Sequence, residues 1–214
     1  MKEVNIGHTA EPNCQLPAGN CQLKNVCVYC ASSTQVDEKY FRAAQELGAL
    51  IALKGLRLIT GAGRLGLMNT IQDAALAAGG EAIGVIPTFM VKEGWHHTGL
   101  TELIETHSMH ERKQTMANLS DGIIALPGGC GTMEELLEII TWKQLGLYVN
   151  PIVVLNIDGY YDALLAQLEK AVDENFMRTI HADIWKVATT PAEAIELLLT
   201  TPKWNKNIRK FAAI

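Results

Sequence analysis

A glycine-rich turn ahead of a helix is the feature of this sequence that most directly indicates chemistry. The turn reads Pro-Gly-Gly-Cys-Gly over Pro127–Gly131, and it follows a short apolar stretch, Gly122–Leu126. A backbone with so little side-chain cover lets an anion approach its N–H groups, and the positive end of the helix dipole attracts the same anion. The residues predicted to bind a phosphate here are Gly128, Gly129, Gly131 and Thr132.

Glu135, just beyond the turn, is the candidate catalytic carboxylate, and two roles are open to it. Thr132 is predicted as the helix N-cap, and Thr132-x-x-Glu135 has the spacing of a capping box, in which the glutamate only bonds the N-cap amide. A carboxylate beside a nucleotide sugar can instead stabilise the positive charge at C1' as an N-glycosidic bond breaks, or deprotonate the attacking water. The residues alone favour the capping role over catalysis, because capping boxes are common.

A second segment, Met109–Lys113, places two cations at the start of a predicted helix. The helix dipole disfavours cations there by about 0.3–1 kcal/mol, and an anion bound between this segment and the glycine turn would remove that penalty. Arg112 would supply a permanently charged guanidinium and Lys113 a mobile ammonium. The alternative is an ordinary salt bridge of these cations to Glu111 or Glu105.

Two further strand ends carry groups suited to a nucleotide. Ser32 and Ser33 follow the first predicted strand, where their hydroxyls can bind phosphate or ribose, or simply form a turn. Gly61–Gly66 has the G-x-G-x-x-G pattern of dinucleotide-binding proteins. The acid about 20 positions later, Glu81, precedes the next strand and so lies at the wrong edge of the sheet for a ribose contact. Gly63 is therefore predicted to line a mononucleotide pocket, with a dinucleotide-binding protein as the alternative.

These motifs resemble those of the Lonely Guy family, cytokinin riboside 5'-monophosphate phosphoribohydrolases that are often labelled possible lysine decarboxylases. Pro127–Glu135 resembles the family's PGGxGTxxE signature, and Met109–Lys113 resembles its MHxRK element at the family's distance from the turn. The resemblance covers about Asn25 to Leu198. The sequence departs from the family's glycines at Ala31, Ala62 and Asn69.

The resemblance implies an enzyme that hydrolyses the N-glycosidic bond of AMP or an N6-substituted AMP to free base and ribose 5-phosphate, without a metal or other cofactor. It implies that Arg112 and Glu135 are the catalytic pair, and that Glu93 and Thr141 contact the substrate. It also implies a homodimer with its sites at the subunit contact.

Two other functions are alternatives to hydrolysis. A nucleotide or cofactor carrier, resembling the molybdenum-cofactor carrier proteins, would keep the glycine turn without requiring Arg112 and Glu135 together. A lysine decarboxylase would need a lysine that forms a Schiff base with pyridoxal phosphate, and no lysine here has a context typical of one.

Alternating strands and helices must position these groups. The predicted strands are Asn25–Cys30, Leu56–Thr60, Ala82–Ile86, Glu102–His107, Gly122–Leu126, Pro151–Asn156 and Ile184–Thr189. The predicted helices are Asp37–Lys54, Gly66–Ala78, one carrying Arg112, one after the glycine turn, Tyr160–Glu174 and Pro191–Leu199, with a loop over Pro87–Thr101. This alternation predicts a single-domain, Rossmann-like α/β fold: a doubly wound parallel sheet that binds ligands at the carboxyl ends of its strands.

Length and composition exclude several classes of protein. A chain of 214 residues with 48% hydrophobic content suits one domain, predicted over 25–200 between a flexible extension, 1–24, and a tail, 201–214. A net charge of −5 without a basic run argues against a nucleic-acid partner. No apolar run is long enough for a membrane span and no signal peptide is recognisable, so a cytoplasmic protein without a membrane partner is predicted.

The five cysteines are an odd number in a chain without an export signal, which argues against a disulfide framework. Cys27 and Cys30 form a C-x-x-C, but within a strand they would point to opposite faces. A zinc site that also uses Cys14, Cys21 and His8 is a minor alternative, and buried thiols are expected instead.

Overall fold

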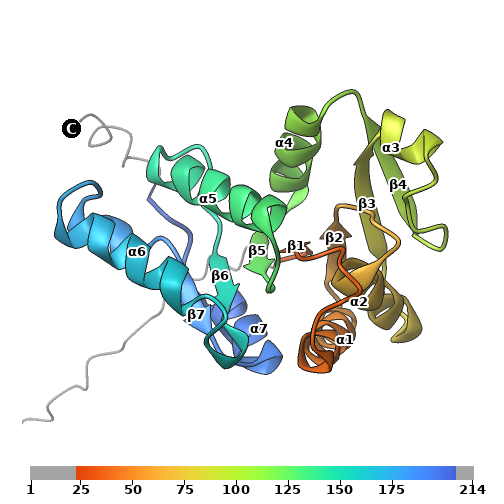
Figure 1. Cartoon of the computed structure of the whole chain (residues 1–214), viewed down its shortest axis with the longest axis horizontal. Helices are drawn as coiled ribbons and strands as arrows, with labels where there is room; N and C mark the ends of the chain where they lie inside the picture. Colours follow the sequence, from red (N-terminus) through yellow and green to blue (C-terminus); the bar gives the residue numbers. More distant parts are fainter. Residues whose placement is uncertain (1–22, 206–214) are drawn as a thin grey trace, which may run out of the picture.

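The structure, a computed structural model, describes residues 23–205 and is built on a seven-stranded parallel sheet. The strand order is β4-β3-β2-β1-β5-β6-β7 (Figure 1). The strands are β1 Asn25–Tyr29, β2 Arg57–Thr60, β3 Ala82–Pro87, β4 Glu102–Thr106, β5 Gly122–Ala125, β6 Ile152–Leu155 and β7 Lys186–Ala188. The predicted doubly wound, Rossmann-like sheet is confirmed.

Seven α-helices and two 3-10 helices connect these strands within the described residues. They are α1 Glu38–Leu53, α2 Gly66–Ala77, α3 Thr88–Lys92, α4 Met109–Leu119, α5 Cys130–Gln144, η1 Ile157–Gly159, α6 Asp162–Asp173, η2 Thr179–Asp183 and α7 Pro191–Thr200. The predicted loop Pro87–Thr101 is wrong in part, because it contains α3. This helix is only five residues long and buries no residue completely, so it carries little apolar periodicity to reveal it.

Helices cover both faces of the sheet. On one face α1, α2 and α7 pack against residues such as Val28 and Ile124. On the other, α4, α5 and α6 pack against residues such as Cys27 and Ile123 (Figure 1). Neighbouring strand residues thus enter opposite cores, which explains why the strands are apolar at nearly every position.

The direction of winding reverses between β1 and β5, which pair with each other at the centre of the sheet. From β1 the chain proceeds outward to β4, and α4 then returns it to the other side of β1. Connections that leave in opposite directions open a crevice at the carboxyl ends of these two strands. The segments that follow β1 and β5 there are the Ser32–Ser33 pair and the glycine turn.

The predicted extension, 1–24, and tail, 201–214, lie largely outside the described residues. The start of the tail contacts the domain, because Trp204 donates its backbone N–H to the carbonyl of Val149 at 2.7 Å. None of the helices in the described part of the chain is both long and apolar enough to cross a membrane.

Candidate active site

A pocket of about 380 Å³ lies at this crevice and brings together most of the predicted site residues. Its walls come from the end of β1, the Gly61–Gly66 loop, α4 and the start of α5. The predicted residues in its lining are Ser32, Ser33, Gly63, Arg112, Gly129, Gly131, Thr132 and Glu135.

Arg112 and Glu135, the predicted catalytic pair, form an ion pair inside this pocket. Nη1 of Arg112 lies 2.8 Å from Oε1 of Glu135, and the two side chains are only 8% and 11% exposed. The guanidinium is held from a second side, because its Nε donates to the carbonyl oxygen of Val85 at 3.1 Å. Two charged groups from separate helices therefore occupy one largely desolvated site.

The capping-box interpretation of Glu135 is wrong. Helix α5 begins at Cys130, with Gly129 as its N-cap, so Thr132 lies inside the first turn and is not the cap. Glu135 then stands nearly a turn further along, where its carboxylate meets Arg112. The salt bridge of Arg112 to Glu111 is likewise replaced by the one to Glu135, and Glu111 accepts a hydrogen bond from the backbone N–H of His107 instead.

Burial sets the proton affinity of the groups in this pocket. It raises the pKa of Glu135 above its ordinary value, although the nearby Arg112 guanidinium lowers the pKa and limits the rise. A carboxylate with a raised pKa is a stronger proton acceptor near neutral pH than an exposed glutamate. Burial also raises the pKa of Cys30, which lines the same pocket as a neutral thiol.

Gly61 is a site residue whose role the sequence did not reveal. A Cβ at this position would lie 1.8 Å from Nη2 and 2.9 Å from Cζ of Arg112. The first glycine of the G-x-G-x-x-G pattern therefore provides space for the guanidinium of Arg112. Glu81 is the acid that a dinucleotide-binding protein would use for the ribose. It precedes β3, and its Oε2 lies 3.9 Å from Nε of Arg57, at the edge of the sheet opposite to the pocket.

The rest of the glycine loop packs closely against the segment after β1. A Cβ on Gly66, whose φ is +62°, would lie 2.4 Å from the carbonyl oxygen of Ser33. Ala62, which departs from the family's glycine, adopts the left-handed conformation with φ 62° and is fully buried. The loop thus keeps its glycine-like backbone although an alanine occupies this position.

The glycine turn presents free amide groups to the pocket. No acceptor among the described residues bonds the backbone N–H groups of Gly129, Cys130, Gly131 or Thr132, as expected for the first turn of a helix. Gly128 lies outside the lining: a Cβ there would be 2.1 Å from Oγ1 of Thr132. Its predicted phosphate contact remains a prediction, and its observed role is to allow this close packing.

Three other predicted substrate contacts do not line the pocket. Lys113 donates from Nζ to Glu134 and, at 3.1 Å, to Glu138. Partial burial disfavours its charge, but these hydrogen bonds outweigh that effect and raise the pKa of Lys113. The alternative of a salt bridge from Lys113 to Glu111 or Glu105 is therefore wrong, because Lys113 pairs with Glu134 and Glu138.

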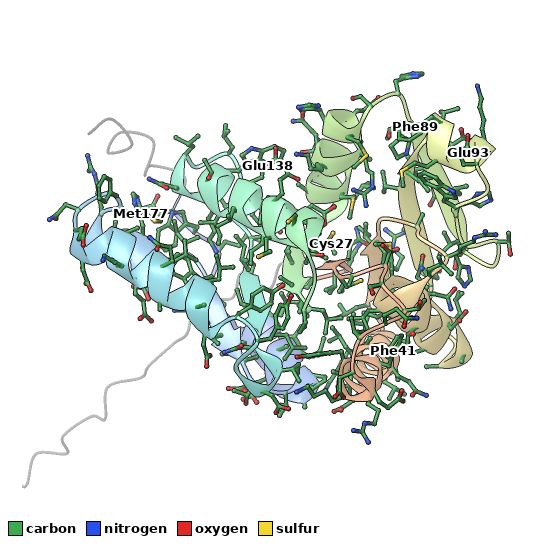
Figure 2. All side chains as sticks on the ribbon, in the orientation of Figure 1. Cys27, Phe41, Phe89, Glu93, Glu138 and Met177 are labelled. Atoms are coloured by element: carbon green, nitrogen blue, oxygen red, sulfur yellow. The ribbon has the colours of Figure 1, made fainter. Side chains whose placement is uncertain are left out.

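Thr141 and Glu93 lie further away. Thr141 lines an open groove along α5, next to the pocket, together with Cys130, Met133, Glu134, Leu137 and Glu138. Glu93 is the exposed C-cap of α3, and Figure 2 shows it well separated from Glu138 of α5. Their contacts with substrate stay predictions.

Three methionines also line the pocket, and the sequence did not indicate a shared site for them: Met68, Met90 and Met109. They come from α2, α3 and α4, so they are brought together only by the fold. Sδ of Met68 accepts a hydrogen bond from the N–H of Gly63 at 2.9 Å. One part of the pocket is therefore apolar and polarizable.

Residues 23–205 contain no group of three or more histidine, cysteine, aspartate or glutamate side chains arranged to hold a metal ion. Cys27 and Cys30 are both buried, in the cores on opposite faces of the sheet. The other members of the zinc alternative, Cys14, Cys21 and His8, lie outside the described residues.

Comparisons of the sequence with known proteins identify close relatives. A family model described as possible lysine decarboxylase matches residues 68–198. A cytokinin riboside 5'-monophosphate phosphoribohydrolase of Arabidopsis thaliana is 44% identical over 180 residues, covering 83% of this chain and 78% of its own. The protein of the same name from Rhodococcoides fascians is 47% identical over 156 residues, covering 72% of this chain and 78% of its own.

Solved structures with the same fold include cofactor-binding proteins. The molybdenum cofactor binding protein from Rippkaea orientalis has a TM-score of 0.63 and 26% identity, covering 83% of this chain and 96% of its own. A Moco carrier protein from Chlamydomonas reinhardtii has a TM-score of 0.62 and 26% identity, covering 81% of this chain and 93% of its own.

Proposed function

The chain belongs to the Lonely Guy family of cytokinin riboside 5'-monophosphate phosphoribohydrolases, and on this premise we propose how its pocket acts. It is a hydrolase that cleaves the N-glycosidic bond of AMP-like nucleotides, releasing free base and ribose 5-phosphate. The observation that carries the assignment of the site is the buried ion pair of Arg112 and Glu135 next to the free amides of the glycine turn.

Glu135 acts on the sugar. As the N-glycosidic bond breaks, positive charge develops at C1' and negative charge on the departing base. The carboxylate of Glu135 stabilises the positive centre and accepts a proton from the attacking water, a role that its raised pKa favours. Arg112 orients the carboxylate and remains charged throughout, so it also stabilises negative charge on the substrate.

The glycine turn holds the 5'-phosphate. Gly129, Gly131, Thr132, Ser32 and Ser33 all line the pocket, and we assign the phosphate to their backbone N–H groups and hydroxyls. The amides of the glycine turn lie at the positive end of α5, which favours a dianionic group although no lysine is among the described residues that line the pocket. The phosphate thereby fixes the ribose next to Glu135.

The methionines receive the base. Met68, Met90 and Met109 offer an apolar, adaptable surface in the same pocket as the ion pair. An apolar substituent at N6 of adenine would be buried against them, so the proposed substrates are N6-substituted AMP derivatives in preference to AMP itself.

A second copy of the chain completes the site. The groove along α5 that contains Thr141 adjoins the pocket, since Glu134 lines both, and it exposes Leu137. A homodimer that covers this groove would bring Thr141, and Lys113 with its two glutamates, to a substrate bound next to them. Gel filtration with light scattering tests the dimer, and Leu137→Glu should dissociate it.

Two other functions fit the pocket less well. A pyridoxal phosphate decarboxylase needs a lysine at the cofactor, and no lysine is among the described residues that line the pocket. A cofactor carrier would use the glycine turn, but it has no evident need for a carboxylate that is desolvated and bound to an arginine.

The proposal is tested by incubating the purified full-length protein with AMP and N6-isopentenyl-AMP in the presence of a chelator, and by detecting the free base chromatographically. We expect base release, faster with the substituted nucleotide. Glu135→Ala should lower the rate by about 10²–10⁴-fold, the usual contribution of a positioned acid or base.

Glu169→Ala is the control, since Glu169 is an exposed glutamate of α6 that lines neither the pocket nor the groove along α5. Its base release should stay close to that of the parent protein. If Glu135→Ala hydrolyses the nucleotide as fast as Glu169→Ala does, Glu135 has no catalytic role.

A further inference from the structure

Two adjacent tyrosines bind the backbone of the glycine turn from outside the pocket. The hydroxyl of Tyr160 donates to the carbonyl oxygen of Gly128 at 2.7 Å. The hydroxyl of Tyr161 donates to the carbonyl oxygen of Leu126, also at 2.7 Å. Both tyrosines belong to the connection between β6 and α6, and neither is part of the pocket lining. The glycine turn after β5 is therefore held in place by the segment that follows the neighbouring strand, β6.

The position of the Tyr160 hydroxyl is fixed by its surroundings. Its ring packs edge-on between two others, with centroids 5.7 Å from Tyr40 and 5.0 Å from Tyr161. The connection itself is held by Asn156, whose Oδ1 accepts from the N–H of Tyr161 at 2.7 Å and whose Nδ2 donates to Asp162 at 2.7 Å. Tyr160 thus contacts the turn from a rigid base.

The peptide that Tyr160 holds has its N–H on the other side. In a trans peptide the carbonyl and the N–H of the next residue point in opposite directions. Because Tyr160 binds the carbonyl of Gly128 outside the pocket, the N–H of Gly129 points away from Tyr160, and Gly129 lines the pocket. The corresponding bond of Tyr161 cannot act in this way, since the residue after Leu126 is Pro127, which has no N–H.

The same peptide is flanked by two glycines, so little else restrains it. Glycine accepts positive and negative φ almost equally, and a peptide between two glycines can therefore rotate at low steric cost. Rotation would turn the carbonyl of Gly128 toward the pocket, where it would repel an anion and remove one amide donor.

We propose that Tyr160 is a positioning residue whose hydroxyl holds the Gly128–Gly129 peptide so that the N–H of Gly129 binds the substrate's phosphate. This inference rests on the proposed function insofar as it places the phosphate at the glycine turn. It does not depend on hydrolysis, because it concerns binding alone.

The test measures equilibrium binding of two ligands by calorimetry: ribose 5-phosphate, which carries the phosphate, and adenosine, which does not. The variant is Tyr160→Phe, and Tyr40→Phe is the matched control. Tyr40 lies in the same ring cluster, and its hydroxyl bonds no group among the described residues. Tyr160 is 42% exposed, so water can replace its hydroxyl at Gly128 and the fold is retained.

We expect Tyr160→Phe to bind ribose 5-phosphate about tenfold more weakly, the effect of losing one hydrogen bond to a charged group. Its affinity for adenosine and its melting temperature should match those of Tyr40→Phe. With AMP as substrate, KM should rise while kcat is largely kept, because the phosphate is bound equally before and during bond cleavage.

Unchanged binding of ribose 5-phosphate by Tyr160→Phe would overturn the proposal. An equal loss for both ligands would also overturn it, because it would indicate a general structural effect. A parent protein that binds ribose 5-phosphate but releases no base would refute the hydrolase alone and leave the result for Tyr160 standing.

Discussion

Replacing Gly61 with alanine should displace the guanidinium of Arg112 while leaving the side chains of Arg112 and Glu135 chemically unchanged. The new Cβ would lie 1.8 Å from Nη2, 2.9 Å from Cζ and 3.4 Å from Nε of Arg112. The guanidinium must therefore retreat by roughly 1.7 Å to reach ordinary van der Waals separation. Such a shift breaks its 2.8 Å contact with Glu135 and its 3.1 Å bond to Val85.

The expected loss in kcat/KM is about 10²-fold, since a displacement of about 1 Å at a reacting centre has effects of this size. The clash involves the end of a side chain and no backbone atom, so the fold should persist. Base release is measured chromatographically for Gly61→Ala, for Arg112→Ala and for the double variant, with circular dichroism as the check on folding.

The double variant decides the interpretation. If alanine at position 61 acts only by displacing the guanidinium, it should have little further effect once Arg112 is already alanine. A loss of equal size in both backgrounds would show that Gly61 acts through the loop backbone. Parental kcat/KM in the Gly61→Ala variant would refute the positioning role altogether.

Two further predictions concern pH. Burial raises the pKa of Glu135, and the proposed reaction needs its carboxylate ionised, so kcat should fall on acidification at a pH above 4.5, the ordinary pKa of glutamate. Initial rates across a pH series measure this fall. A fall centred at or below pH 4.5 would contradict the proposed role of Glu135. Lys143 is buried, and burial lowers its pKa from the ordinary 10.5 to about 8. The folded state therefore binds the ammonium proton of Lys143 less tightly than the unfolded state does. The contribution of Lys143 to the free energy of unfolding consequently becomes more favourable to the folded state as pH rises from about 8 to 10.5. Urea unfolding should therefore show that the free energy of unfolding of Lys143→Met, relative to that of the parent protein, declines by roughly 1–3 kcal/mol between pH 7 and pH 10. A difference that stays constant over this range would exclude the lowered pKa of Lys143.

The elements of the fold were predictable because their signals are local. Apolar runs such as Gly122–Leu126 mark strands that are buried on both faces, and strict alternation with helices leaves a doubly wound sheet as the natural arrangement. Helix α3 escaped prediction because five residues are too few to display a helical period.

The sequence by itself determined which segments meet at the crevice and which residue types they bring, because the carboxyl ends of parallel strands share one edge. It could not decide whether Glu135 caps its own helix or faces an arginine 23 residues away, since both roles have the same local spacing. The tertiary structure decided this by starting α5 at Cys130 and by placing Arg112 across the space left by Gly61. It likewise paired Lys113 with the acids of α5 and put Tyr160 behind the glycine turn. Contacts of this kind depend on side-chain packing between distant elements, which no pattern within one segment specifies.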